Sequence, residues 1–107
     1  MDEIMILWST FPDAEKAREV ARALVEAGVA ACVNVMPGVE SVYRWEGKIE
    51  TASEVLAMIK TTREALPRCE ARLRELHPYE VPEILAVRAD HVAESYARWV
   101  RENTTPA

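Results

Sequence analysis

The sequence contains few of the residues that mark disulfide-rich, membrane-spanning or repetitive proteins. Its 107 residues include only two cysteines, three glycines and one phenylalanine. Two cysteines cannot form the disulfide framework of a small secreted domain. No apolar run approaches the ~20 residues of a membrane span, and the N-terminus is acidic where a secretory leader needs basic residues. The composition therefore predicts a cytoplasmic protein with reduced thiols and no contact with a membrane.

Basic residues are also in the minority. Thirteen lysines and arginines face 18 aspartates and glutamates, which gives a formal net charge of -5. Nucleic-acid binding needs a basic surface, so this charge argues against a nucleic-acid partner. No P-loop, dinucleotide fingerprint, nucleophile elbow or zincin motif occurs. The sequence thus predicts neither an enzyme nor an organic cofactor.

What the sequence does contain is one long pair of strands that reverses direction at Trp45–Lys48. Strand-forming residues run from Ala30 to Trp45 and are interrupted only at Pro37-Gly38. At ~3.3 Å per residue this arm would span roughly 50 Å, whereas a domain of this size has a radius of gyration of about 13 Å. We expect the hairpin to kink, protrude or pair with another chain. Tyr43 and Trp45, on one face of its outer part, are expected at the boundary with that chain.

The hydrophobic pattern predicts seven elements within one domain over residues 1–103, followed by a frayed tail at 104–107. In chain order they are a strand at Glu3–Ser9, a helix at Asp13–Ala27, the hairpin strands Ala30–Trp45 and Lys48–Thr61, a helix from Leu66 after a Thr61/Glu64 capping box, a strand at Val81–Val87, and a last helix capped by Asp90 or His91. This order predicts an α+β fold: a ferredoxin-like β-α-β-β-α-β sandwich with an extra C-terminal helix. Two helices cover one face of such a sheet, so the other face is expected to need a second subunit.

His77 and Cys32 are the candidate metal ligands. His77 lies between the end of a helix and Pro78, where its imidazole suits copper or zinc. Its cation could equally offset the dipole at the helix C-terminus. Cys32 is either a thiolate ligand or a small buried hydrophobe. One histidine is a poor site by itself, because metals take several ligands.

Lys60, Tyr79 and Glu83 form a second candidate group. Lys60 ends an otherwise apolar strand, while Tyr79 and Glu83 share a turn that Pro78 and Pro82 make stiff. Such a turn is a plausible wall of a ligand-binding cleft. The alternative is a Lys60–Glu83 pair that only satisfies buried polar groups.

The sequence resembles the CutA family of divalent cation tolerance proteins over nearly its whole length. The resemblance rests on ordered motifs: Ala30–Asn34, Pro37-Gly38, Ser41–Lys48, Glu54, Lys60–Thr62 and His77–Ile84. It implies a ferredoxin-like homotrimer whose hairpins wrap neighbouring subunits, in a plan similar to that of the PII signalling proteins.

The resemblance also implies binding of a divalent cation, with copper as the favoured ion and no established reaction. Family members credited with copper binding can carry Cys at the position of Ser9 and a His pair at Leu76-His77, so only His77 carries over. The alternative is a PII-like sensor or scaffold. In that case an intersubunit cleft lined by Cys32, Lys60, Tyr79 and Glu83 would hold a small anion or a segment of a partner.

Overall fold

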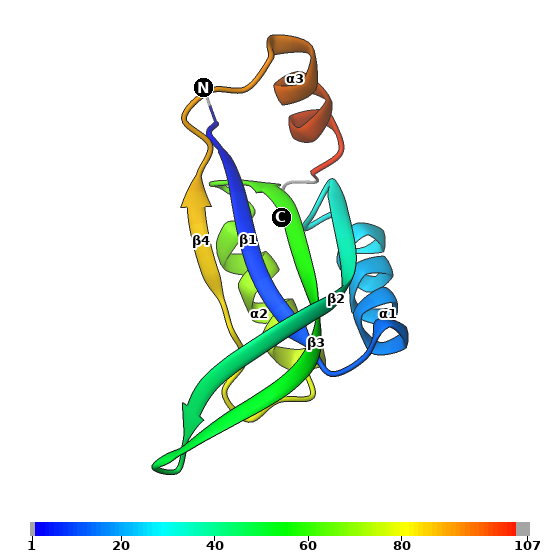
Figure 1. Cartoon of the computed structure of the whole chain (residues 1–107). Helices are drawn as coiled ribbons and strands as arrows, with labels where there is room; N and C mark the ends of the chain where they lie inside the picture. Colours follow the sequence, from blue (N-terminus) through cyan, green and yellow to red (C-terminus); the bar gives the residue numbers. More distant parts are fainter. Residues whose placement is uncertain (1, 105–107) are drawn as a thin grey trace.

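The computed structural model describes residues 2–104 and contains three helices and four strands (Figure 1). The elements are β1 (Ile4–Phe11), α1 (Ala14–Glu26), β2 (Cys32–Trp45), β3 (Lys48–Thr62), α2 (Leu66–Leu76), β4 (Leu85–Arg88) and α3 (Glu94–Glu102). The strands form one antiparallel sheet in the order β2-β3-β1-β4. The predicted α+β, ferredoxin-like plan with an extra C-terminal helix is confirmed.

The core lies between the sheet and the two helices α1 and α2. Alternate residues of a strand point to opposite faces, and on β1 the fully buried Leu7 and Phe11 point to the helices. Helix α1 contributes Val20 to this cluster, and α2 contributes Cys69. Helix α3 instead packs near the beginning of β1, in a second, smaller cluster (Figure 1). Most of the opposite face of the sheet therefore has no helix over it.

The hairpin of β2 and β3 extends beyond this core. Glu46 and Gly47 form its two-residue turn with positive φ angles of 49° and 79°, the geometry that matches the twist of the strands. The register shifts between Met36 and Val39, where Gly38 has a φ of 84°, so the ribbon bends there. The molecule measures 44 × 25 × 21 Å as a result. The predicted kink at Pro37-Gly38 and the predicted protrusion are confirmed.

The outer part of the hairpin exposes large apolar side chains. The exposed fractions are 66% for Val42, 62% for Ile49, 46% for Trp45 and 43% for Tyr43. The base is different, because Val55 and other helix-facing residues of β3 are buried. No part of residues 2–104 covers the apolar side chains near the tip.

The fourth strand is shorter than predicted. It covers Leu85–Arg88 rather than Val81–Val87. Pro82 has no N–H for a strand ladder, and the chain approaches β1 only where Leu85 pairs with Trp8. The segment 79–84 is therefore a loop. The first strand, in contrast, continues two residues past its predicted end, to Phe11.

Both predicted caps of the later helices are wrong. Helix α3 begins after Ala93, which provides no side-chain cap, so neither Asp90 nor His91 caps it. The Thr61 hydroxyl donates to the Val29 carbonyl at 2.7 Å and joins β3 to the loop between α1 and β2. Thr62, one residue later, accepts from the Ala65 N–H at 3.2 Å at the entrance to α2.

Thr104, the first residue of the predicted tail, packs against α3. Thr104 is buried, and its hydroxyl donates to the Val100 carbonyl at 2.6 Å. The predicted tail thus does not begin at Thr104, and its remaining residues, 105–107, lie outside the described part. None of the helices within residues 2–104 is long and apolar enough to cross a membrane.

Candidate functional site

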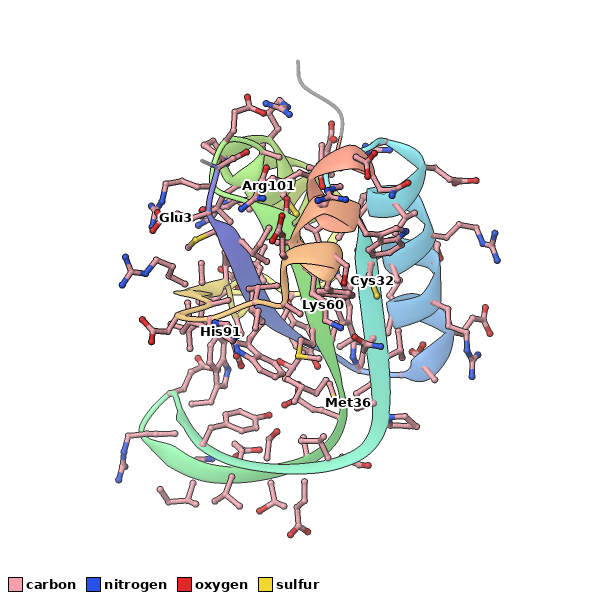
Figure 2. The ribbon with its side chains drawn as sticks, turned by 90° about the horizontal axis from the view of Figure 1, so that it is seen from above. Glu3, Cys32, Met36, Lys60, His91 and Arg101 are labelled. Carbon is pink, nitrogen blue, oxygen red and sulfur yellow. The ribbon has the colours of Figure 1, made fainter. Side chains whose placement is uncertain are left out.

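Cys32 and Lys60 lie next to each other on the face of the sheet that α1 and α2 leave open. They are direct partners in the β2–β3 register, and Figure 2 shows both side chains close to α3. The Lys60 Nζ lies 5.6 Å from the centre of the Tyr96 ring of α3, within the range of a cation–π contact. The Cys32 Sγ lies 3.9 Å from the Asn34 Oδ1. This pair therefore belongs to the α3 end of the open face.

His77 occupies a buried position beside Thr10, near the end of β1. Its ring stacks on Phe11 with the centroids 4.5 Å apart. The Tyr79 N–H donates to Nδ1 at 3.1 Å, so Nε2 carries the proton and donates to the Thr10 carbonyl at 2.8 Å. Burial lowers the pKa of His77, although the Thr10 contact opposes this shift. The geometry therefore favours a neutral imidazole over the cation that would offset the α2 dipole.

The lowered pKa of His77 predicts that stability falls on acidification. The unfolded chain protonates this imidazole near pH ~6.5, whereas the folded chain resists protonation to lower pH. The contribution of His77 to stability is fully present above the pKa of the unfolded chain. It is lost as the pH falls through the lower pKa of the folded protein. We expect metal-free protein to show a lower free energy of unfolding at pH 5 than at pH 7.5, by urea titration at a fixed protein concentration.

The other histidine provides the matched control for this pH dependence. His91 is exposed, so a His91→Ala variant should keep the slope of the wild type between the two pH values. A His77→Gln variant should flatten it. An equal slope in His77→Gln and wild type would show that other groups cause the acid sensitivity.

Tyr79 is held by Glu54, a residue that the sequence reasoning included only among the family motifs. The Tyr79 hydroxyl donates to the Glu54 Oε2 at 2.6 Å. Burial raises the pKa of Tyr79, and the bond to Glu54 raises it further. The only local signal for Glu54 was its position as the last charged residue before the buried stretch that begins at Val55.

Tyr79, Glu54 and Glu83 line a groove between the hairpin and the 78–83 loop. The groove has a volume of about 760 Å³. Its walls also contain Tyr43 and Trp45 of β2, the two residues predicted at the boundary with another chain. The structure thus joins the predicted cleft residues Tyr79 and Glu83 to the outer part of the hairpin.

The single chain does not bring all the predicted site residues together. Lys60 is level with Ile6 of β1, whereas His77 contacts Thr10, four residues further along the same strand. At ~3.3 Å per residue this separation is about 13 Å. Cys32, the partner of Lys60, lies at the same level of the sheet but one strand further from β1. Within residues 2–104, no three His, Cys, Asp or Glu side chains are grouped to hold a metal ion, and Lys60 and Glu83 form no ion pair.

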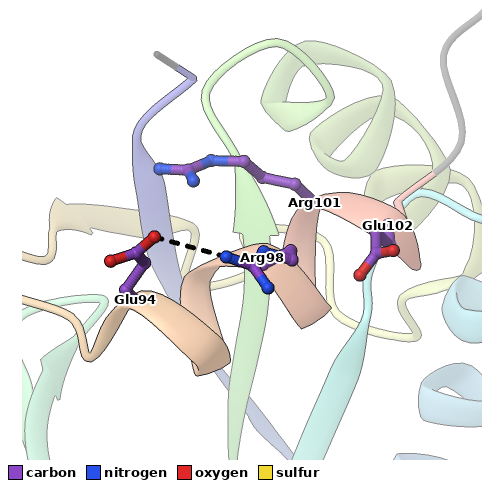
Figure 3. A pocket seen from close by; sticks show the side chains of 4 residues that line it. All are labelled: Glu94, Arg98, Arg101 and Glu102. Atoms are coloured by element: carbon purple, nitrogen blue, oxygen red, sulfur yellow. Dashed lines mark hydrogen bonds and ion pairs between the residues drawn. The ribbon is translucent and has the colours of Figure 1, made fainter.

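Two further polar features lie outside these groups. Ser9 is fully buried between Leu7 and Phe11 on the helix-facing side of β1, and its Oγ has no hydrogen-bond partner among the described residues. A hollow of about 410 Å³ on α3 is lined by four charged residues (Figure 3). There Arg98 pairs with Glu94 at 3.2 Å, and the Arg101 Nε donates to the Asp2 carbonyl at 2.8 Å. The first contact lies within α3, and the second holds Asp2 against it.

Comparisons with known proteins agree with one another. The family model "CutA1 divalent ion tolerance protein" matches residues 5–103. The divalent-cation tolerance protein CutA of Thermus thermophilus is 45% identical over 104 residues, which cover 97% of this chain and 99% of that protein. Human protein CutA is 46% identical over 95 residues, or 89% of this chain and 53% of its own length. The chain thus spans nearly all of the bacterial relative and about half of the human one.

Solved structures give the same result at the level of the fold. The crystal structure of CutA from Xylella fastidiosa superposes with a TM-score of 0.94 at 38% identity, covering 96% of this chain and 99% of that one. The Thermus thermophilus protein gives a TM-score of 0.92 at 44% identity, covering 95% and 99%.

Proposed function

Because the chain belongs to the CutA1 divalent ion tolerance protein family, we propose that it is a cytoplasmic homotrimer that binds divalent cations, with copper as the favoured ion. The proposed activity is binding rather than catalysis. The observation that carries the assembly is the apolar surface of the hairpin and of the open sheet face.

The apolar surface is large for a chain that works alone. In addition to the apolar residues near the hairpin tip, Leu85 and Val87 of β4 expose 56% and 42% of their surface areas. Exposed apolar patches of this kind mark protein–protein contacts. A homotrimer supplies the cover by repeating one contact around a three-fold axis. In this proposal Tyr43 and Trp45 lie at the boundary between neighbouring subunits.

The metal ligands that we propose are His77 and Cys32, supplied by neighbouring chains because they lie apart in one chain. The neutral state of His77 supports this proposal. A neutral imidazole has a lone pair at Nδ1, so it can bind a metal without first losing a proton. A metal at Nδ1 must displace the hydrogen bond from the Tyr79 N–H. Affinity should therefore be weak, and the ligand set should depend on assembly.

Calorimetry with Cu²⁺ tests these ligands. We expect His77→Ala and Cys32→Ser each to weaken binding about tenfold or more, since loss of one of few ligands costs most of the affinity. His91→Ala provides the matched control, because His91 is exposed and is not among the proposed ligands. If His77→Ala binds Cu²⁺ as the wild type does, this histidine is not a ligand. If all three variants bind alike, the metal lies elsewhere.

A PII-like sensor is the second candidate function, and the groove beside the hairpin favours it. Its volume falls within the ~300–1,000 Å³ of small-molecule sites. A thermal-shift screen of small metabolites would test for such a sensor, because a ligand that binds only the folded state raises the melting temperature. A screen without any shift would remove this candidate while leaving the proposed trimer and its metal ligands intact.

A further inference from the structure

Lys60 is a half-buried cation on the uncovered face of the sheet, and the single chain gives it no anion. It is opposite Ile6 of β1 and Cys32 of β2 in the register, so its side chain lies on the face away from α1 and α2 (Figure 2). Its Nζ lies 5.6 Å from the centre of the Tyr96 ring. Within residues 2–104 Lys60 forms no ion pair. A subunit that covers this face would therefore remove water from an ammonium group that no carboxylate neutralises, which is costly.

The groove between the hairpin and the 78–83 loop carries the opposite charge further along the same face. Glu54, Glu80 and Glu83 line it, together with Thr10, which lies on the same side of β1 as Ile6. No lysine, arginine or histidine is among the described residues that line the groove. In the part of the chain that the structure describes, these three carboxylates form no ion pair. The groove thus has negative charge that its own chain leaves unbalanced.

Lys60 and the groove cannot meet within one chain. Lys60 is level with Ile6, whereas the groove includes Thr10, four residues further along β1. At ~3.3 Å per residue this separation is about 13 Å, and an ion pair needs a distance of about 4 Å or less. An anion for Lys60 therefore has to come from another molecule.

A three-fold ring supplies such a partner, because its contacts join unlike surfaces. In a two-fold dimer a surface meets its own copy, but in a closed ring of three each contact joins two different surfaces of the chain. This chain has a cationic surface at Lys60 and an anionic surface at the groove. Opposite charges that face each other favour one orientation of the neighbours over others. Tyr43 and Trp45, proposed at the boundary between subunits, form part of the groove wall, so the groove lies where a neighbouring chain is expected.

Glu83 is the carboxylate best placed to receive a lysine from a neighbour. Glu54 is half-buried and already accepts from the Tyr79 hydroxyl at 2.6 Å. Glu83 is exposed and lies two residues before Leu85, whose 56% exposed side chain begins the uncovered apolar strip of β4. Glu80 is further from β4 along the chain. A contact that covers Leu85 therefore reaches Glu83 first.

We propose that Lys60 of each chain forms an ion pair with Glu83 of the neighbouring chain, in the groove between the hairpin and the 78–83 loop. The inference rests on the proposed homotrimer and names the polar contact that orients its subunits. The same placement brings Cys32, the register partner of Lys60, toward His77, which accepts from the Tyr79 N–H of the loop. It therefore agrees with metal ligands that are supplied by two chains.

The rate of subunit exchange tests the ion pair. Labelled and unlabelled samples of one protein are mixed, and trimers of mixed isotope content are followed by native mass spectrometry. We expect Lys60→Met and Glu83→Gln each to exchange at least about tenfold faster than the wild type, because each leaves a charge unpaired in the interface. The double variant should exchange at most about threefold faster than the faster single variant, because both changes remove one contact. Effects that multiply in the double variant, or wild-type rates in both single variants, would overturn the proposal.

Glu80→Gln is the matched control, because Glu80 is an exposed carboxylate of the same loop and groove. Its exchange rate should stay within about twofold of the wild type, as expected for an exposed charge. Faster exchange in Glu80→Gln than in Glu83→Gln would contradict the assignment to Glu83.

Charge reversal gives a second test that does not depend on truncated side chains. Lys60→Glu and Glu83→Lys each place like charges together, whereas the double reversal restores opposite charges. Light scattering should therefore show more trimer for the double reversal than for either single one, and equal masses for all three would overturn the pair. Wild-type protein with the mass of one chain would contradict the homotrimer itself. A wild-type trimer whose variants behave alike would contradict only the ion pair.

Discussion

Shortening the hairpin to end at Ser41 and Ala52 is expected to convert the proposed trimer into single chains or aggregates. In this variant an Asn-Gly turn replaces residues 42–51. Ser41 and Ala52 are direct partners in the register, four pairs from the Trp45–Lys48 pair that flanks the native turn, so a two-residue turn can join them without a slip. The change removes the apolar side chains of the outer hairpin that the single chain leaves in water. Multi-angle light scattering at micromolar concentration would measure the mass.

A matched variant separates loss of contact from damage to the turn. Glu46 has a positive φ of 49°, a conformation that asparagine adopts more readily. Glu46→Asn should therefore keep the hairpin, the mass and the stability of the wild type. If the shortened chain keeps the full mass as well, the outer hairpin makes no essential contact between subunits.

Phe11→Ala is expected to lower the free energy of unfolding by about 3–5 kcal/mol, the range for phenylalanines deleted from cores. The side chain is 1% exposed and belongs to the cluster under α1 and α2. Its ring also supports His77 at 4.5 Å, so the substitution opens a cavity next to the Tyr79 loop. Urea unfolding at one fixed protein concentration would measure the loss.

Val81→Ala is the control for this substitution. Val81 is 69% exposed, so its replacement removes apolar side-chain atoms from the surface rather than from the core. Its effect should stay within about 0.5 kcal/mol. A loss below about 1 kcal/mol for Phe11→Ala would contradict the described role of this ring in the core.

Much of the fold follows from local pattern in the sequence. The alternation of buried and exposed residues, the Asp13 cap of α1 and the turn at Glu46-Gly47 are each determined by neighbouring residues. Asp13, for example, accepts from the Lys16 N–H at 2.7 Å. Errors occurred where the partner lies far away along the chain. Thr61 bonds to Val29 across 32 positions, and a local capping pattern cannot show this contact.

The grouping of the candidate residues could not be predicted from the sequence. The register places Lys60 beside Cys32, and the loop places Tyr79 beside Glu54. The prediction placed these residues in one cleft, because nothing in the sequence shows that Lys60 lies level with Ile6 of β1 whereas His77 contacts Thr10. It also could not show that both His77 nitrogens are used in hydrogen bonds, since this depends on the path of residues 77–79 past Thr10.

The mass of the unmodified protein in solution is the most direct test of the idea that the apolar hairpin and open sheet face are covered by sister chains. Light scattering after size-exclusion chromatography should report three times the 12.1 kDa of one chain across the micromolar range. A stable species of 12.1 kDa that stays soluble under the same conditions would contradict it.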